Sequence, residues 1–314
     1  MWIRFGSVVA VAWLLGSQAA AGQTPKPPAN DDCLACHGEH VDAKAFDAST
    51  HGPMACVDCH ADLAKVTDFP HADKVAKVRC ASCHDDIGAK YKDSIHAWAK
   101  EKAGLVVAPA CADCHGKHDI RAKTDAQSRV FRATVPVTCG TCHDGIKEQY
   151  DRGIHAAKLK IGDSRAPSCA DCHTAHGIQR VDTDSWRLKV TAECGTCHAP
   201  VVDSFRRTFH GKVTSMGFTA VATCSDCHGA HDILPAANSA SRVSKARRVE
   251  TCGRCHTGAN EQFVKYDPHP NPSDYRRSAV LWWANRFYWV LIPGCFGFFG
   301  LHSALWFWRG RKQS

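Results

Sequence analysis

The sequence predicts short α-helices and coil with little or no β-sheet, followed by one C-terminal transmembrane helix. Three observations support this fold class. A motif of two cysteines and a histidine, CxxCH, recurs along most of the chain and ties the coil down at many points. Residues 85–104 and 144–162 place apolar residues three and four apart, which is the spacing of short helices. Residues 287–308 form an apolar run that is long enough to cross a bilayer.

The N-terminal residues 1–21 have the pattern of a secretory signal. Arg4 precedes a short apolar run, and small residues at 19–21 match a cleavage site. A retained membrane helix is the alternative, although the apolar run is short for a span. A Pro-rich linker at residues 22–32 follows, so we expect the body of the chain, residues 33–277, to be exported.

The CxxCH motif occurs nine times and uses eighteen of the nineteen cysteines, which leaves Cys295 as a small apolar residue. Disulfides would not need the histidine, structural zinc does not require one at a fixed next position, and nine identical pairs do not suit a single cysteine nucleophile. A covalent c-type haem needs two thiols for its vinyl groups and an imidazole for its iron. We therefore predict nine haems attached at Cys33, Cys36, Cys56, Cys59, Cys80, Cys83, Cys111, Cys114, Cys139, Cys142, Cys169, Cys172, Cys194, Cys197, Cys224, Cys227, Cys252 and Cys255. The proximal iron ligands are then His37, His60, His84, His115, His143, His173, His198, His228 and His256.

Nine haems in residues 33–277 leave so few residues for each that the porphyrins must form most of the apolar interior. The fold class is therefore a multihaem cytochrome c, with helices and coil wrapped around closely packed haems. The formal net charge of +8 is not evidence for nucleic-acid binding, because two propionates on each haem add negative charge that the count leaves out. Export suits a periplasmic location, where bacterial c-type haems are attached.

An internal repeat assigns the other histidines. Three units of about 55 to 60 residues begin at Cys80, Cys139 and Cys194. Each unit has one CxxCH, an aromatic residue and a histidine five residues apart, and a second CxxCH in CADCHGKHDI, CADCHTAHGI or CSDCHGAHDI. Each unit thus carries two haems and the four histidines that two six-coordinate irons require. The candidate distal ligands are His40, His51, His71, His96, His118, His155, His176, His210, His231 and His269.

The spacing restricts the pairing of these ligands. Three of them, His118, His176 and His231, follow a proximal histidine by three residues, so we expect each to bind the iron of another haem. The segment after the last motif offers His269 for the haem on Cys252 and Cys255. Twenty histidines minus nine proximal and nine distal ligands leave two spare, which we expect to be His302 and one of His40, His51 and His71. Met54 and Met216 are alternative sixth ligands.

Nine six-coordinate haems in a thin polypeptide predict a conductor of electrons, and we assign no catalytic residue. An enzyme of the nitrite reductase or hydroxylamine oxidoreductase type is the alternative, and it would need one iron with an open position. A haem-rich scaffold or storage protein is a third hypothesis, which predicts no rapid reduction by a quinol-linked partner.

The C-terminal segment predicts a membrane anchor, residues 278–308 including an interfacial lead-in, and a cytoplasmic tail at 309–314. Tryptophans bracket the apolar run, as interfacial anchors do. A buried core helix is the alternative. Glycines at 294, 297 and 300 would let a second helix approach closely, and His302 is an ionisable group in hydrocarbon.

The tail DPHPNPSDYRRSAVLWWANRFYWVLIPGCFGFFGLHSALWFWR resembles the junction, in bacterial inner-membrane multihaem cytochromes, between a periplasmic haem array and the helix that leads into a diheme b-type cytochrome domain. The resemblance implies a quinone-linked electron-transfer subunit of the respiratory inner membrane. Because this chain stops at Ser314, we expect the b-type cytochrome to be a separate subunit, with periplasmic or outer-membrane cytochromes as further partners. His302 would bind a b-haem shared with that subunit, hydrogen-bond to its helix, or lie solvated at the interface.

Overall fold

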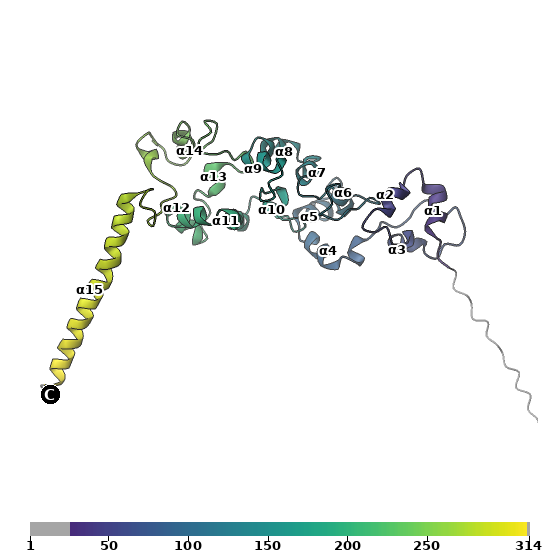
Figure 1. Ribbon diagram of the computed structural model, residues 1–314. Coiled ribbons are helices and arrows are strands. Elements are labelled where there is room, and N and C mark those ends of the chain that lie inside the picture. The colour runs from purple at the N-terminus through teal and green to yellow at the C-terminus, as the bar shows by residue number, and fades with distance from the viewer. Residues whose placement is uncertain (1–25, 313–314) are drawn as a thin grey trace, which may run out of the picture.

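The computed structural model describes residues 26–312, so the expected signal at 1–21, the start of the linker and the last two residues of the tail lie outside the described part. The molecule is an elongated array that runs broadly in chain order from α1 at one end to α12, α13 and α14 at the other, with α15 projecting away from that end (Figure 1). Helices and coil make up the described residues, which contain no β-strand. This agrees with the predicted fold class.

Apart from α11 and α15, the helices are short. The first half of the array contains α1 (Asn30–His37), α2 (Ala43–Asp47), α3 (Cys56–Cys59), the 3₁₀ turns η1 (Ala61–Leu63) and η2 (Cys80–Ser82), α4 (Asp85–Lys92), α5 (Ile95–Glu101), α6 (Cys111–His115) and α7 (Val135–Gly140). The second half contains α8 (Asp144–Asp151), α9 (Ile154–Lys160), α10 (Cys169–His173), α11 (Asp184–Arg206), α12 (Phe209–Ser215), α13 (Cys224–His228), α14 (Arg248–Gly253), η3 (Phe263–Lys265) and α15 (Ala279–Arg311).

Four CxxCH motifs fold as one-turn helices because an aspartate inside the motif caps them. In α6, the Asp113 carboxylate accepts a hydrogen bond from the Ala110 backbone N–H at 2.7 Å, which satisfies an N–H that the helix leaves free. The same contact recurs in α3, α10 and α13 through Asp58, Asp171 and Asp226. The cap orients the first turn, so the two cysteines and the following histidine have the same arrangement in each copy.

Consecutive repeat units are joined by a backbone hydrogen bond next to the candidate distal histidines. The N–H of Ile95, which precedes His96, donates to the Ile178 carbonyl of the next unit at 2.7 Å. The same bond joins Thr50 to Ile120 and Ile154 to Ile233, each at 2.8 Å. The repeat therefore interlocks neighbours, and each unit holds a histidine against the unit that follows it.

The protein core is small for a chain of this length. Few apolar side chains are buried, and the one cluster that they form in the described residues consists of Tyr150, Ala156, Leu159 and Ala166. A cluster of this size buries only a small part of the apolar surface of a 314-residue chain. The apolar interior of the folded molecule must come largely from groups other than side chains.

Helix α15 is long and apolar enough to cross a membrane, and it does not pack on the array. Its first turn is capped by the Ser278 hydroxyl, which accepts a hydrogen bond from the Leu281 N–H at 3.3 Å. The helix continues to Arg311, into the segment expected to form the tail, and the Arg311 guanidinium lies over the Phe307 ring.

Candidate haem-binding sites

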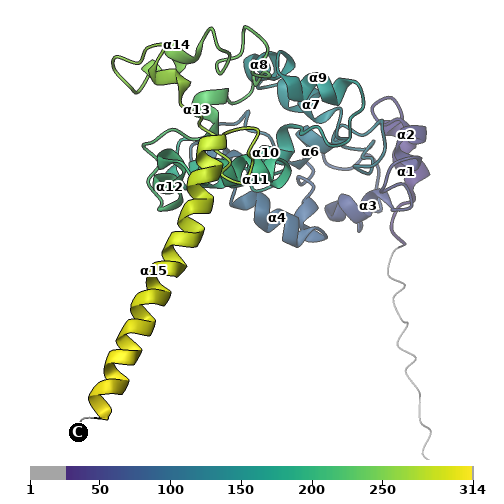
Figure 2. The same cartoon turned by 60° about the vertical axis from the view of Figure 1, so that its left-hand side comes forward.

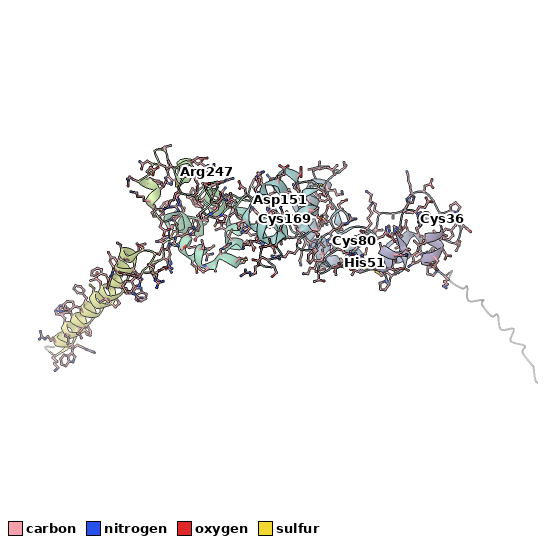
Figure 3. All side chains as sticks on the ribbon, turned by 45° about the horizontal axis from the view of Figure 1, so that its top comes forward. Cys36, His51, Cys80, Asp151, Cys169 and Arg247 are labelled. Atoms are coloured by element: carbon pink, nitrogen blue, oxygen red, sulfur yellow. The ribbon has the colours of Figure 1, made fainter. Side chains whose placement is uncertain are left out.

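Each of the nine motif histidines faces one other histidine. The distances between ring centroids are 5.9 Å for His37 and His71, 6.5 Å for His60 and His118, 6.1 Å for His84 and His51, 6.0 Å for His115 and His176, 6.1 Å for His143 and His96, 6.1 Å for His173 and His231, 6.4 Å for His198 and His155, 6.1 Å for His228 and His269, and 5.9 Å for His256 and His210. No histidine of the described chain belongs to two pairs. Figure 3 labels Cys36 near one end of the array, Arg247 near the other, and Cys80 and Cys169 between them.

The spacing of these pairs fits one iron atom between two imidazoles. A metal–imidazole bond is about 2 Å and a ring nitrogen lies about 1 Å from its centroid, so two rings on opposite sides of an iron have centroids about 6 Å apart. The observed range of 5.9 to 6.5 Å agrees with this value. The residues present therefore fit a haem with two axial histidines.

Burial lowers the pKa of ten of these imidazoles and so favours the neutral form, which is the form that binds a metal. Loss of hydration is the largest cause that lowers the pKa of His155 and His228, and the facing imidazole adds to the effect. Burial also lowers the pKa of His96, His115, His118, His173, His176, His210, His231 and His269. No proton must therefore be displaced from these rings near neutral pH.

Two rules describe the repeated pairs. The histidine three residues after a second motif reaches back, so that His118, His176 and His231 face His60, His115 and His173 of the preceding unit. The histidine after the aromatic residue reaches forward past the next motif, so that His96, His155 and His210 face His143, His198 and His256 in the first motif of the following unit. Every repeated pair therefore crosses a boundary between units.

The structure differs from the sequence-based expectation for His269. We expected it beside the motif of Cys252 and Cys255, but its ring faces His228, and His256 of the expected motif faces His210. Its Nδ1 atom lies 3.1 Å from Ser204 Oγ on α11, which holds the ring at this position. Sequence patterns did not reveal Ser204, because the two residues are 65 positions apart and belong to no shared repeat.

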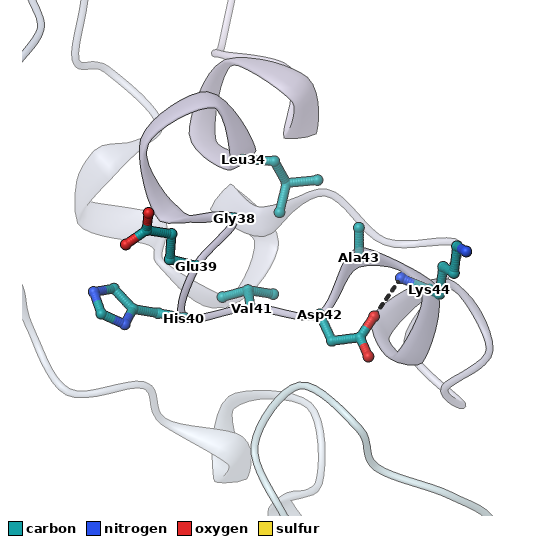
Figure 4. Close-up of a pocket in the computed structure, with 8 residues that line it drawn as sticks. All are labelled: Leu34, Gly38, Glu39, His40, Val41, Asp42, Ala43 and Lys44. Carbon is teal, nitrogen blue, oxygen red and sulfur yellow. Dashed lines mark hydrogen bonds between the residues drawn. The ribbon is translucent and has the colours of Figure 1, made fainter.

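Two histidines face no other histidine in the described part of the chain. His40 lines a shallow pocket with Leu34, Glu39 and Val41 close to the first motif (Figure 4). His302 lies on α15, where its ring stacks against Phe298 with centroids 6.4 Å apart. His302 is the spare histidine expected in the membrane helix, and His40 is one of the three candidates named for the second spare histidine.

The cysteines place the nine motifs in a continuous series. A hydrogen bond between the thiols of Cys139 and Cys169 lowers the pKa of Cys139 to about 7 and raises that of Cys169. The first cysteines also meet in the pairs Cys33 and Cys56, Cys80 and Cys111, and Cys194 and Cys224. Four further cysteines, each the second of its motif, lie close to the cysteines of the next motif along the chain. Burial, and to a smaller extent these neighbouring thiols, raises the pKa of Cys59, Cys114, Cys172 and Cys227. Each motif is thus next to its successor from Cys33 to Cys255.

The described cysteines and histidines do not fit the alternative chemistries. All nineteen cysteines are unpaired, so the CxxCH pairs form no disulfide. Within residues 26–312, no group of three or more histidine, cysteine, aspartate or glutamate side chains is arranged to hold a metal ion directly, whereas structural zinc takes four such ligands. Covalent haem c is the chemistry that this donor set supports.

Comparisons with known proteins give the same class. The family model described as cytochrome c3 matches residues 49–144. The multiheme cytochrome MtrA of Shewanella baltica is 28% identical over 198 residues, which are 55% of this chain and 54% of that protein. The high-molecular-weight cytochrome c of Nitratidesulfovibrio vulgaris is 25% identical over 233 residues, 73% of this chain and 34% of that protein. No solved structure matches the chain.

The similarity covers only part of these relatives. The chain spans about half the length of the first protein and about a third of the second. The aligned region supports the helical, haem-binding character of the array.

Proposed function

The chain is a multihaem c-type cytochrome, and from this premise we propose that it conducts electrons through nine covalently attached haems. The observation that carries the proposal is the pairing of all nine motif histidines, each with one distal histidine. An iron with two imidazoles has no position left for a substrate, which disfavours a nitrite or hydroxylamine enzyme. Bound haem would supply a one-electron change of iron valence. The chain would supply the cysteines that attach each haem, the two histidines that bind its iron, and the position of each haem beside the next.

Electron paramagnetic resonance of the fully oxidised, purified protein tests this proposal. We expect nine haems per chain, all low-spin, because each iron has two strong-field nitrogen ligands. The haem-to-protein ratio measured on the same sample establishes the stoichiometry. A high-spin signal equal to one haem per chain would reveal an open iron and favour the enzyme.

The membrane helix supports a partner for this conductor. A methyl group added at Gly294, Gly297 or Gly300 would have no neighbouring atom within 4 Å, so their side of α15 is open to close helix packing. Together with the resemblance of the tail, this supports a quinone-linked b-type cytochrome subunit in the inner membrane, with residues 33–277 in the periplasm. Periplasmic or outer-membrane cytochromes would exchange electrons with the other end of the array.

His302 tests the identity of this partner. If the residue binds a b-haem shared with the partner, His302→Ala should reduce the b-haem content of the purified complex by one haem, with the c-haem content unchanged. Ser303→Ala, at the next position of the same helix, is the matched control. Unchanged b-haem in the His302→Ala complex would leave an interhelical hydrogen bond or a solvated position as the role of His302.

A further inference from the structure

The site formed by His228 and His269 is built differently from the repeated sites. Its second histidine comes from the segment that leads into the membrane helix, outside the three repeat units. Like His71 at the opposite end of the array, it closes a site where no further repeat supplies a histidine. His71 and His269 are also the two histidines of the described chain whose Nδ1 atoms have hydrogen-bond partners. The partner of His71 is the Ala72 carbonyl, and those of His269 are Ser204 and the Val201 carbonyl.

The contacts of Ser204 settle which nitrogen of His269 carries the proton. The Ser204 hydroxyl donates to the Val201 carbonyl at 2.6 Å, so its single proton is already in use. Its oxygen must therefore accept at the 3.1 Å contact with His269 Nδ1, and the Val201 carbonyl, 3.3 Å from the same atom, can only accept. Both contacts require Nδ1–H, which leaves Nε2 of His269 unprotonated and available to a metal. Ser204 itself is buried, and its contact with His269 is partly buried.

The same histidine is tied to the start of the membrane helix. Its backbone N–H donates to the Asp267 carboxylate at 2.9 Å. That carboxylate accepts two hydrogen bonds from the Arg277 guanidinium, at 2.7 and 2.8 Å, and Arg277 immediately precedes Ser278, the capping residue of α15. The two-point arginine pair restrains both distance and orientation. Figures 1 and 2 both place α12, the helix after α11, beside the beginning of α15.

We propose that Ser204 is the positioning residue of the haem site on Cys224 and Cys227, and that through His269 this site is coupled to the start of the membrane helix. The inference rests on the proposed function, in which His228 and His269 are the two ligands of that iron. An Nδ1–H bond to an acceptor makes an imidazole a stronger donor to the metal and favours the ferric state. The site next to the membrane partner is therefore tuned by a residue of α11 that does not touch the iron.

Ser204→Ala tests this role by a redox titration of the purified protein, followed in the haem absorbance. We expect one ninth of the absorbance change to move to a more positive potential. At the wild-type midpoint, the oxidised-to-reduced ratio of that haem should fall about two- to tenfold, the equivalent of one neutral hydrogen bond. Ser204→Thr keeps the hydroxyl and should restore the wild-type curve. An unchanged curve for Ser204→Ala would overturn the proposal.

Ser215→Ala is the matched control, because the Ser215 hydroxyl on the neighbouring helix α12 donates only to the Gly211 carbonyl, at 2.7 Å. The same shift in this variant would also overturn the proposal, since it would show a general effect of removing a hydroxyl from the unit. His269→Ala distinguishes the ligand role of His269 from the positioning role of Ser204, and it should give one high-spin haem. If all nine haems stay low-spin, the assigned ligand pair is wrong. If one becomes high-spin while Ser204→Ala has no effect, only the positioning role fails.

Discussion

Replacing His118 with alanine is expected to convert one of nine low-spin haems to high-spin. Its ring faces His60, 6.5 Å away between centroids, so the affected haem is the one on Cys56 and Cys59 and not the one that His118 follows in sequence. The open iron should bind carbon monoxide after reduction, at one molecule per chain. Electron paramagnetic resonance and carbon monoxide titration measure the two effects.

His40→Ala is a close control for this variant. His40 follows its motif histidine by three residues in CHGEH, as His118 does in CHGKH, but its ring faces no other histidine in the described chain. We expect nine low-spin haems and no binding of carbon monoxide. A high-spin haem in His40→Ala, or none in His118→Ala, would show that the ring distances do not report the ligand pairs.

Chain produced without haem attachment is expected not to fold. The buried apolar side chains form one small cluster around Tyr150 and Leu159, and the helices that carry the motifs are one turn long. Helices of this length are not stable alone in water, so their order depends on packing that the side chains do not provide. Far-ultraviolet circular dichroism should show loss of most helix in the array, and limited proteolysis should cut throughout residues 33–277.

Removal of a single terminal haem provides the comparison. Cys252→Ala combined with Cys255→Ala affects the last motif of the series, so the other eight haems should stay attached and the units before residue 224 should keep their protease resistance. Haem-free chain with native helix content and native resistance would contradict the idea that the cofactors form the interior.

The sequence predicted those parts of the structure that repeat. The motifs indicate the candidate attachment cysteines and proximal histidines, and the register of the units singles out His96 and His118 because the same residue type returns at the same distance. Sequence reasoning failed at the ends, where no second copy exists for comparison. The expected partner of His269 was wrong because the segment that contains His269 folds back onto α11, where it contacts Ser204 and Val201 across more than sixty residues. The secondary structure was predictable only as short helices, since the side chains alone specify little packing.

The crossing of ligand pairs between units has a consequence for the order in which the protein matures. The rings of His84, His143, His198 and His256 face histidines from earlier in the chain, at His51, His96, His155 and His210. Under the proposed function, in which the chain is exported from its N-terminus, these sites would have both ligands as soon as the haem is attached. The rings of His37, His60, His115, His173 and His228 face later histidines, so these sites would wait for later residues, and the last of them would wait for His269. Under the proposed function, that histidine emerges immediately before α15, so we expect completion of the ligand sets and arrest of export in the membrane to be nearly simultaneous.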